Sequence, residues 1–245
     1  MLILLPPSET KRDGGTGAPL DLAALGFPEL DPARRQTLGA LKALSRNLGA
    51  AAGMLRLGPA SAGEAAKNRA IATAATMPAL DRYDGVLFDE LDAASLPESA
   101  RRFAGEHVAI GSALFGLTRA LDPIPAYRLS HDSRLPGTTL TRIWAQASPE
   151  LARHGLVLDL RSEGYASLLP VPAAADGWYV RVVAEDGAGR KRALNHFNKK
   201  GKGAFTRRLL LAGIDHADAE SLLAWAAAEG IRLERGAPGE LDLVV

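Results

Sequence analysis

Short apolar runs mark the predicted strands of the first two-thirds of the chain. Residues 2–5 are uniformly apolar and end at Pro6, which predicts a buried strand. The segments 84–88, 107–110 and 156–160 each contain a shorter apolar run of three residues, and each is a strand candidate. Helical patterns separate these runs, so strands and helices are expected to alternate along this part of the chain.

Two of the intervening segments carry helix signals. Asp31 and the proline after it suit the start of a helix, and the leucines between residues 38 and 48 then fall close to one helical face. Ser61 and Glu64 form a possible capping box before an alanine-rich stretch, which predicts a second helix.

The last third adds hairpins to this pattern. Two strands at 178–185 and 190–197 flank an Asp-Gly turn, a short helix follows at 203–212, and Asp215 can cap another helix. A final hairpin is expected over 231–245. Alternating elements followed by hairpins favour a mixed α/β (α+β) fold, in which helices surround one mixed sheet. We expect residues 1–245 to form a single domain.

Composition narrows the classes of function. Of the 245 residues, 47% are hydrophobic and 23% are charged, as in ordinary globular proteins. The sequence has no cysteine, which excludes disulfides, thiol nucleophiles and cysteine-ligated metal. The first residues lack the basic region of a signal peptide, and no apolar stretch approaches membrane-spanning length. We therefore expect a cytoplasmic protein without a membrane partner.

Positive charge is concentrated in one segment. The net charge is only +1, yet residues 190–208 hold eight Lys or Arg residues and no Asp or Glu, which leaves −7 for the rest. This asymmetry favours a local anion-binding face. Glycine in a basic turn that opens a helix allows phosphate to approach free backbone amides. The candidate phosphate-binding residues are Lys199, Lys200, Lys202, Gly203, Arg207 and Arg208.

The basic segment has other interpretations. It lacks the Walker pattern, because Gly201-Lys202 is followed by glycine, so a P-loop NTPase is excluded. A solvated loop, or a substrate site that uses one of its lysines, explains the same residues without nucleic acid.

Further polar residues follow the predicted strands, where open α/β sheets bind ligands. Loop hydroxyls can equally satisfy local backbone groups. Glu9 and Glu163 are candidates for a carboxylate pair, although Arg128 or Arg161 can instead pair with one of them. No histidine spacing fits a metal site, and we predict neither metal nor cofactor. The candidate pocket residues are Ser8, Glu9, Thr10, Lys11, Tyr127, Arg128, Ser162, Glu163 and Tyr165.

Several segments together resemble the YaaA peroxide-stress family. They include Leu-Leu-Pro-Pro-Ser-Glu-Thr at 4–10, Tyr-Asp-Gly-Val-Leu-Phe at 83–88, and the stretch from Ser112 to Leu129. Leu-Asp-Leu-Arg-Ser-Glu-Gly-Tyr at 158–165 and the basic segment from residue 196 complete the likeness, which spans nearly the whole chain.

The resemblance implies a compact fold with a positively charged cleft and a helix-hairpin-helix element. It also implies DNA binding and a part in limiting iron-dependent peroxide damage. By position, the basic turn, the Tyr-Arg pair at 127–128 and the Ser-x-x-Tyr at 162–165 match family motifs. Two departures stand out. Glu9 occupies a position that is lysine in some relatives, with Lys11 nearby, and Gly164 replaces an acidic residue.

Two hypotheses follow. In the first, a stress protein binds double-stranded DNA through the basic segment, with weak sequence dependence and strong salt dependence. In the second, an enzyme acts on a nucleotide, nucleoside or related phosphate-bearing ligand at the strand ends. A scaffold whose basic segment binds an acidic protein is a third possibility.

Overall fold

The computed structural model describes residues 1–147, 149–185, 191–193 and 198–245. Its centre is a mixed sheet of eight strands within this described part of the chain, in the order β4-β3-β1-β6-β7-β10-β9, with β8 paired to β7. The strands are β1 (Leu2–Leu5), β3 (Val108–Ser112), β4 (Gly116–Arg119), β6 (Leu156–Asp159), β7 (Asp176–Glu185), β8 (Lys191–Ala193), β9 (Leu233–Arg235) and β10 (Glu240–Val244). A separate small pair joins β2 (Met77–Pro78) to β5 (Pro123–Ile124).

The middle of the sheet is parallel and buried. Strand β1 lies between β3 and β6, and β7 extends the parallel group on the far side of β6. All four residues of β1 are buried, because helices cover both faces of the sheet, and the strand is uniformly apolar for that reason. The sheet is mixed, as the sequence predicted, because the strands at its two edges, β4 and β9, are antiparallel to their neighbours.

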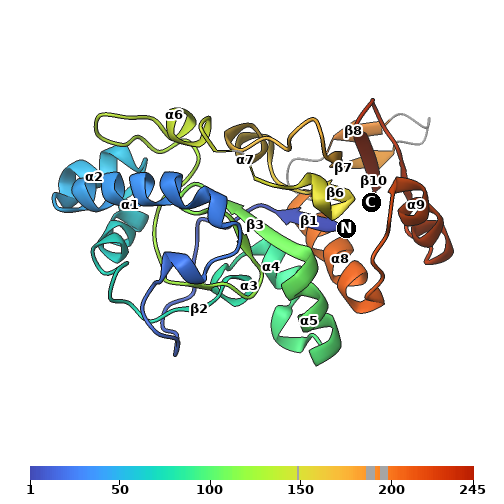
Figure 1. Ribbon diagram of the computed structural model, residues 1–245, viewed down its shortest axis with the longest axis horizontal. Helices are drawn as coiled ribbons and strands as arrows, with labels where there is room; N and C mark the ends of the chain where they lie inside the picture. Colours follow the sequence, from blue (N-terminus) through green and yellow to red (C-terminus); the bar gives the residue numbers. More distant parts are fainter. Residues whose placement is uncertain (148, 186–190, 194–197) are drawn as a thin grey trace.

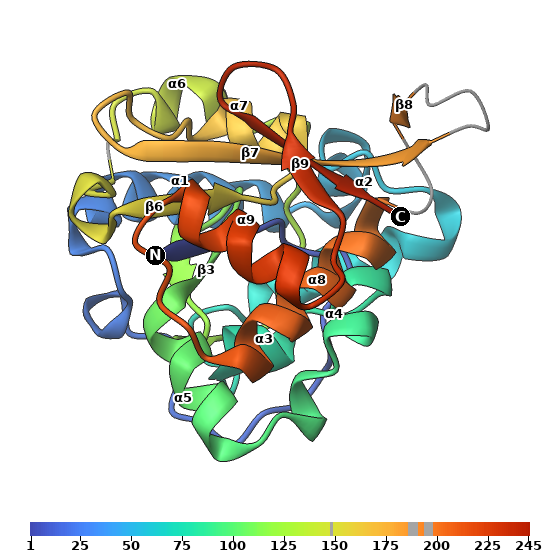
Figure 2. The same cartoon turned by 90° about the vertical axis from the view of Figure 1, so that its right-hand side faces the viewer.

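Helices surround this sheet. Figure 1 places α1 and α2 at one end of the longest axis and α9 at the other. In the view of Figure 2, α8 and α9 lie below β7; α8 contacts β7, and α9 contacts β9. The helices are α1 (Asp31–Ser45), α2 (Leu48–Met54), α3 (Ala79–Arg82), α4 (Val86–Leu91), α5 (Glu98–His107), α6 (Leu140–Trp144), α7 (Glu163–Leu168), α8 (Asn198–Ala212) and α9 (Ala219–Ala228).

Three local predictions are wrong. The strand expected at 84–88 is helix α4: Gly85 has a φ of 106°, and the chain then buries Leu87, Phe88 and Leu91 on one helical face. The alanine-rich stretch forms 3-10 turns over Pro59–Arg69, not an α-helix. The glycine-rich basic turn is also helical, because α8 begins at Asn198, five residues before the predicted start.

The C-terminal third agrees better with its predictions. Strand β8 pairs antiparallel with β7, and the turn predicted at 186–187 lies outside the described residues. Strands β9 and β10 form the final hairpin. Helix α9 is capped by Asp218, whose side chain accepts a hydrogen bond from the Ser221 amide, while Asp215 instead pairs with the amino terminus. In the parts of the chain just delimited, no helix is both long and apolar enough to cross a membrane.

Candidate functional site

Three parallel strands end together and direct three polar segments to one edge of the sheet. Leu5 is in register with Ile110, and Leu4 is in register with Asp159, so the carboxyl ends of β1, β3 and β6 are level. The segments that follow them begin at Pro6, Ala113 and Leu160. The sheet topology therefore brings together residues more than 100 positions apart in sequence.

The segment after β1 is held in place by a short antiparallel pairing. Lys11 forms an isolated bridge with Tyr83, and the amide of Arg12 donates to the Arg82 carbonyl at 2.9 Å. The buried Arg82 guanidinium donates to the carbonyls of Arg12 and Gly14 at 2.5 and 2.9 Å. These contacts fix the backbone on both sides of Lys11 and thereby set the direction of its side chain.

That direction leads into the protein. Lys11 is only 3% exposed, and its ammonium nitrogen lies 4.2 Å from the ring centre of Tyr127 and 5.5 Å from that of Tyr83. Its ammonium donates a hydrogen bond to the Glu9 carbonyl at 3.2 Å. Burial, with a smaller contribution from the Arg128 guanidinium, lowers the pKa of Lys11 to about 7, against the opposite pull of Glu9 and Glu64.

Two tyrosine hydroxyls meet beside this amine. The Tyr83 and Tyr127 oxygens are 2.7 Å apart, and both also interact with the Ser112 hydroxyl at the end of β3. Burial raises the pKa of both phenols well above the ordinary value. Both hydroxyls therefore stay protonated at neutral pH and can donate hydrogen bonds.

Arg128 covers the same site. Its guanidinium pairs with the Glu9 carboxylate and donates to the Glu9 carbonyl at 3.1 Å, so the predicted pairing of Arg128 with a nearby carboxylate is confirmed. Asn68 holds the Arg128 backbone at both its amide and its carbonyl, at 2.7 and 2.9 Å. The Nε atom of Arg128 is buried and has no hydrogen-bond partner among the described residues. Arg161 pairs with Asp159 at 2.7 Å, not with Glu163.

The segment after β6 contributes unevenly. Tyr165 is buried and packs edge-on against His131, with ring centres 4.9 Å apart. Gly164 makes room for that histidine, because a Cβ there would lie 2.5 Å from the imidazole ring. Ser162 and Glu163 are exposed at the start of α7, as Thr10 is after β1. Of the candidate pocket residues, the structure thus gathers Glu9, Lys11, Tyr127, Arg128 and Tyr165.

Four further residues complete this group, which we call the Lys11 cluster, and were not among the predicted site residues: Tyr83, Ser112, Asn68 and Glu64. Tyr83 and Ser112 both lie in segments that carry the family resemblance, which is the signal that could have singled them out. Asn68 and Glu64 lie in the alanine-rich stretch, whose irregular turns were expected to be a regular helix. Their approach to Arg128 and Lys11 depends on tertiary packing that no local pattern reports.

A second buried lysine comes from α8. Lys202 is 3% exposed, its ammonium donates to the Arg161 carbonyl at 3.2 Å, and it lies 5.1 Å from the Tyr179 ring centre. Burial lowers the pKa of Lys202 to about 8, against the pull of Asp159 and Glu163. Asp159 and Tyr179 also line a cavity of about 300 Å³. Lys202 therefore faces the sheet edge, while Lys199 remains exposed on α8.

Carboxylates neutralise much of the outer face of α8. Lys200 pairs with Glu90 at 3.2 Å, and Arg208 pairs with Glu229 at 2.9 Å. Arg207 lies 3.7 Å from Asp92 and also donates to the carbonyls of Leu91 and Asp92. Lys199 has no ion pair with a described residue. The cluster of cations predicted from sequence is thus less positive in the folded protein than along the chain.

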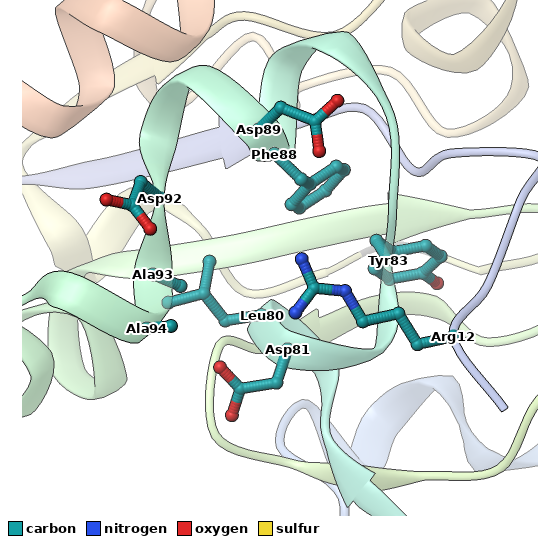
Figure 3. A pocket seen from close by; sticks show the side chains of 9 residues that line it. All are labelled: Arg12, Leu80, Asp81, Tyr83, Phe88, Asp89, Asp92, Ala93 and Ala94. Carbon is teal, nitrogen blue, oxygen red and sulfur yellow. The ribbon is translucent and has the colours of Figure 1, made fainter. Parts of the chain in front are cut away.

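A cavity of about 190 Å³ lies next to the bridge between Lys11 and Tyr83. Figure 3 shows the Arg12 side chain extending into it, between Asp81 on one side and Phe88 and Asp89 on the other. Tyr83 forms part of its wall, so this residue contributes both to the cavity and to the Lys11 cluster. Among the described residues, no group of three or more His, Asp or Glu side chains is arranged to hold a metal ion.

The sequence as a whole also matches known proteins. The family model described as "Peroxide stress protein YaaA" matches residues 1–234. This chain belongs to the YaaA peroxide stress protein family. A UPF0246 protein of Corynebacterium glutamicum is 44% identical over 243 residues, covering 96% of this chain and 95% of the relative.

Other relatives match over similar lengths. A UPF0246 protein of Corynebacterium efficiens is 41% identical over the full length of both chains, and one from Streptomyces coelicolor is 42% identical over 87% of this chain and 84% of its own. The YaaA resemblance expected from the motifs is therefore confirmed, and the Lys11 cluster is built largely from the segments that carried it.

Proposed function

We propose that this YaaA-family protein binds, and acts on, a nucleotide, nucleoside or related phosphate-bearing compound at the Lys11 cluster. The observation that supports this proposal most directly is the surplus of buried hydrogen-bond donors. Within the described part of the chain, the Lys11 ammonium has one acceptor and the buried Nε atom of Arg128 has none. Buried donors are normally satisfied, so such a surplus favours a ligand that brings oxygen acceptors.

The position of the cluster supports the same proposal. It lies outside the carboxyl ends of β1, β3 and β6, where open α/β sheets bind their ligands. Arg128 provides a planar guanidinium suited to phosphate oxygens, and Asn68 fixes its backbone from both sides. Glu9 is then the group that a phosphate would replace on Arg128.

We expect deoxynucleoside 5′-monophosphates to raise the thermal unfolding midpoint of the wild-type protein. At a ligand concentration of 100 times Kd, stabilisation amounts to about 2.7 kcal/mol. Arg128→Met should weaken binding by about tenfold or more, since a hydrogen bond to a charged group contributes about 1.5–3 kcal/mol. Thermal unfolding with a panel of these nucleotides measures both effects.

Arg153→Met is the control. Arg153 is an exposed arginine that pairs with Glu150, and it lies just before β6, at the amino end of the strands and away from the Lys11 cluster. It should leave nucleotide binding unchanged. The proposal fails if no nucleotide stabilises the wild type, or if Arg128→Met binds as well as Arg153→Met does.

A second function, contact with double-stranded DNA, is favoured by the start of α8. This helix of 15 residues has no acidic residue in its first turn, and Lys199 is exposed there without an ion-pair partner among the described residues. Lys199, Lys200, Arg207 and Arg208 supply the side chains for phosphate contacts, while Lys202 and Gly203 hold the helix in place from the buried side. We propose that such binding limits iron-dependent oxidative damage to the duplex. The α8–α9 pair is where a helix-hairpin-helix element would contribute.

DNA contact can be tested with one variant that should weaken binding and one that should strengthen it, because Lys200 is paired with Glu90. Replacing both Lys199 and Lys200 by alanine should weaken duplex binding and reduce the slope of log K against log salt by about 2. Glu90→Gln frees Lys200 from its partner and should strengthen binding and steepen the slope by about 1. Fluorescence anisotropy with a labelled duplex at several salt concentrations measures both. Unchanged slopes in the two variants would exclude this face as the DNA contact.

A further inference from the structure

Lys11 has the environment of a neutral amine, not of an ammonium ion. No carboxylate of the described residues lies within ion-pair distance of its nitrogen, which contacts one carbonyl and two aromatic rings. The exposed Lys200, by contrast, pairs with the Glu90 carboxylate. A desolvated lysine of this kind is a nucleophile for carbonyl carbon, because its lone pair is free at neutral pH.

The groups around the amine suit the same chemistry. The hydroxyls of Tyr83 and Tyr127 meet at 2.7 Å, next to the ring over which the Lys11 nitrogen lies. Ser112 adds a third hydroxyl from the end of β3. Addition of an amine to a carbonyl places negative charge on the former carbonyl oxygen, and protonated hydroxyls can donate hydrogen bonds to it.

Access to Lys11 is controlled by a solvent-facing contact. Glu9 and Arg128 form the ion pair that covers the site, and the Glu9 side chain is 53% exposed. The Arg128 side chain is only 12% exposed, but the carboxylate end of the pair is open to solvent, so a ligand phosphate can approach Arg128 and replace Glu9 there. Displacement would also move the Glu9 carbonyl, which is the hydrogen-bond acceptor of Lys11.

We infer that Lys11 forms an imine with the aldehyde of a phosphate-bearing compound, and that the Glu9–Arg128 pair is the gate which the phosphate of that compound opens. This inference rests on the proposed function of the site and specifies its substrate class. The Lys11 nitrogen adds to the aldehyde carbon, and a proton moves to the oxygen to give a carbinolamine. Loss of one water molecule then forms the C=N bond, and hydrolysis regenerates the amine.

The test uses 2-deoxyribose 5-phosphate as the probe and sodium cyanoborohydride to reduce the imine. Reduction adds two hydrogen atoms, so the protein should gain the mass of one probe molecule less one oxygen atom. Peptide mapping should place this adduct on Lys11. The rate should reach half of its maximum near pH 7, whereas exposed lysines should react appreciably only at much higher pH.

Variants make the assignment specific. Lys11→Met should lose the adduct, and Lys42→Met, at an exposed lysine of α1 outside the cluster, should retain it. Glu9→Gln removes the charge that holds the gate and should increase the labelling rate several-fold. 2-Deoxyribose without phosphate should label wild-type Lys11 at least tenfold more slowly than the phosphorylated probe does.

Three outcomes overturn the inference and can be told apart. If nucleoside monophosphates stabilise the wild type through Arg128 but no adduct forms on Lys11, the imine chemistry is wrong and the binding site stands. If neither stabilisation nor labelling occurs, both proposals fall. Equal labelling of Lys11 and exposed lysines would also overturn the inference, since it would show no special reactivity.

Discussion

Replacing Lys11 with methionine is expected to raise the free energy of unfolding by about 3–4 kcal/mol at pH 6. Methionine fills a similar volume and needs no hydration, whereas the lysine has to remain charged at this pH in a buried position. Its pKa falls from 10.5 to about 7 on folding. At 1.36 kcal/mol per pKa unit this difference sets an upper limit, from which the lost hydrogen bond and cation–π contacts subtract.

The extra stability of Lys11→Met over the wild type should disappear as the pH rises. Between pH 7 and 10.5 the unfolded wild-type chain binds one more proton at Lys11 than the folded chain does, so wild-type stability increases with pH in this window. The variant lacks this contribution. Its advantage should therefore shrink by up to about 1.4 kcal/mol per pH unit and vanish near the upper end of the window.

Urea unfolding of both proteins at pH 6, 8 and 10 measures this difference. Lys199→Met provides the control, because Lys199 is exposed and its substitution should change stability little at any of the three pH values. A stability difference between wild type and Lys11→Met that does not change with pH would show that Lys11 is charged throughout. It would also remove the basis for a nucleophilic amine at this position.

The strands of the central sheet could be predicted because their burial leaves a local signature. Residues 2–5 are apolar throughout, residues 156–160 are apolar except for Asp159, and the two segments form β1 and β6. Residues 84–88 contain a shorter apolar run, residues 86–88, and form a helix, since three consecutive apolar residues fit either element. The turn predicted in the basic segment is wrong for a similar reason. Its glycines suit a turn, but they lie within α8 and allow close packing there.

The candidate site was predictable in its parts but not in its arrangement. Glu9, Lys11, Tyr127 and Arg128 were selected because each lies in a polar segment near a strand end. Sequence could not show that Lys11 points inward, because this depends on its bridge to Tyr83, 72 positions away by the numbering. Nor could it show which carboxylates neutralise α8, since Glu90 and Asp92 lie at the end of α4, a helix that begins where a strand was predicted at 84–88.

The glycines of α8 provide the second prediction with a large effect. Gly203→Ala should destabilise the protein by about 3 kcal/mol, at the upper end of what overpacking costs. A Cβ at this position would lie 2.3 Å from the Leu87 carbonyl oxygen and 2.9 Å from the Glu90 Cβ. The carbonyl belongs to the backbone of α4 and cannot rotate away, so α8 and α4 would have to separate. The greater helix propensity of alanine offsets only about 1 kcal/mol of this cost.

Gly201→Ala is the matched control within the same helix. Its Cβ would lie 3.1 Å from a methyl group of Val182 and 3.3 Å from one of Val245, and both of these side chains can shift by a few tenths of an ångström. The propensity gain should then dominate, and stability should change by less than about 1 kcal/mol. Denaturant unfolding of the two variants separates the cases. Equal effects would mean that Gly203 serves the flexibility of the helix start, whereas a loss confined to Gly203→Ala would establish that this glycine is required where α8 packs on α4.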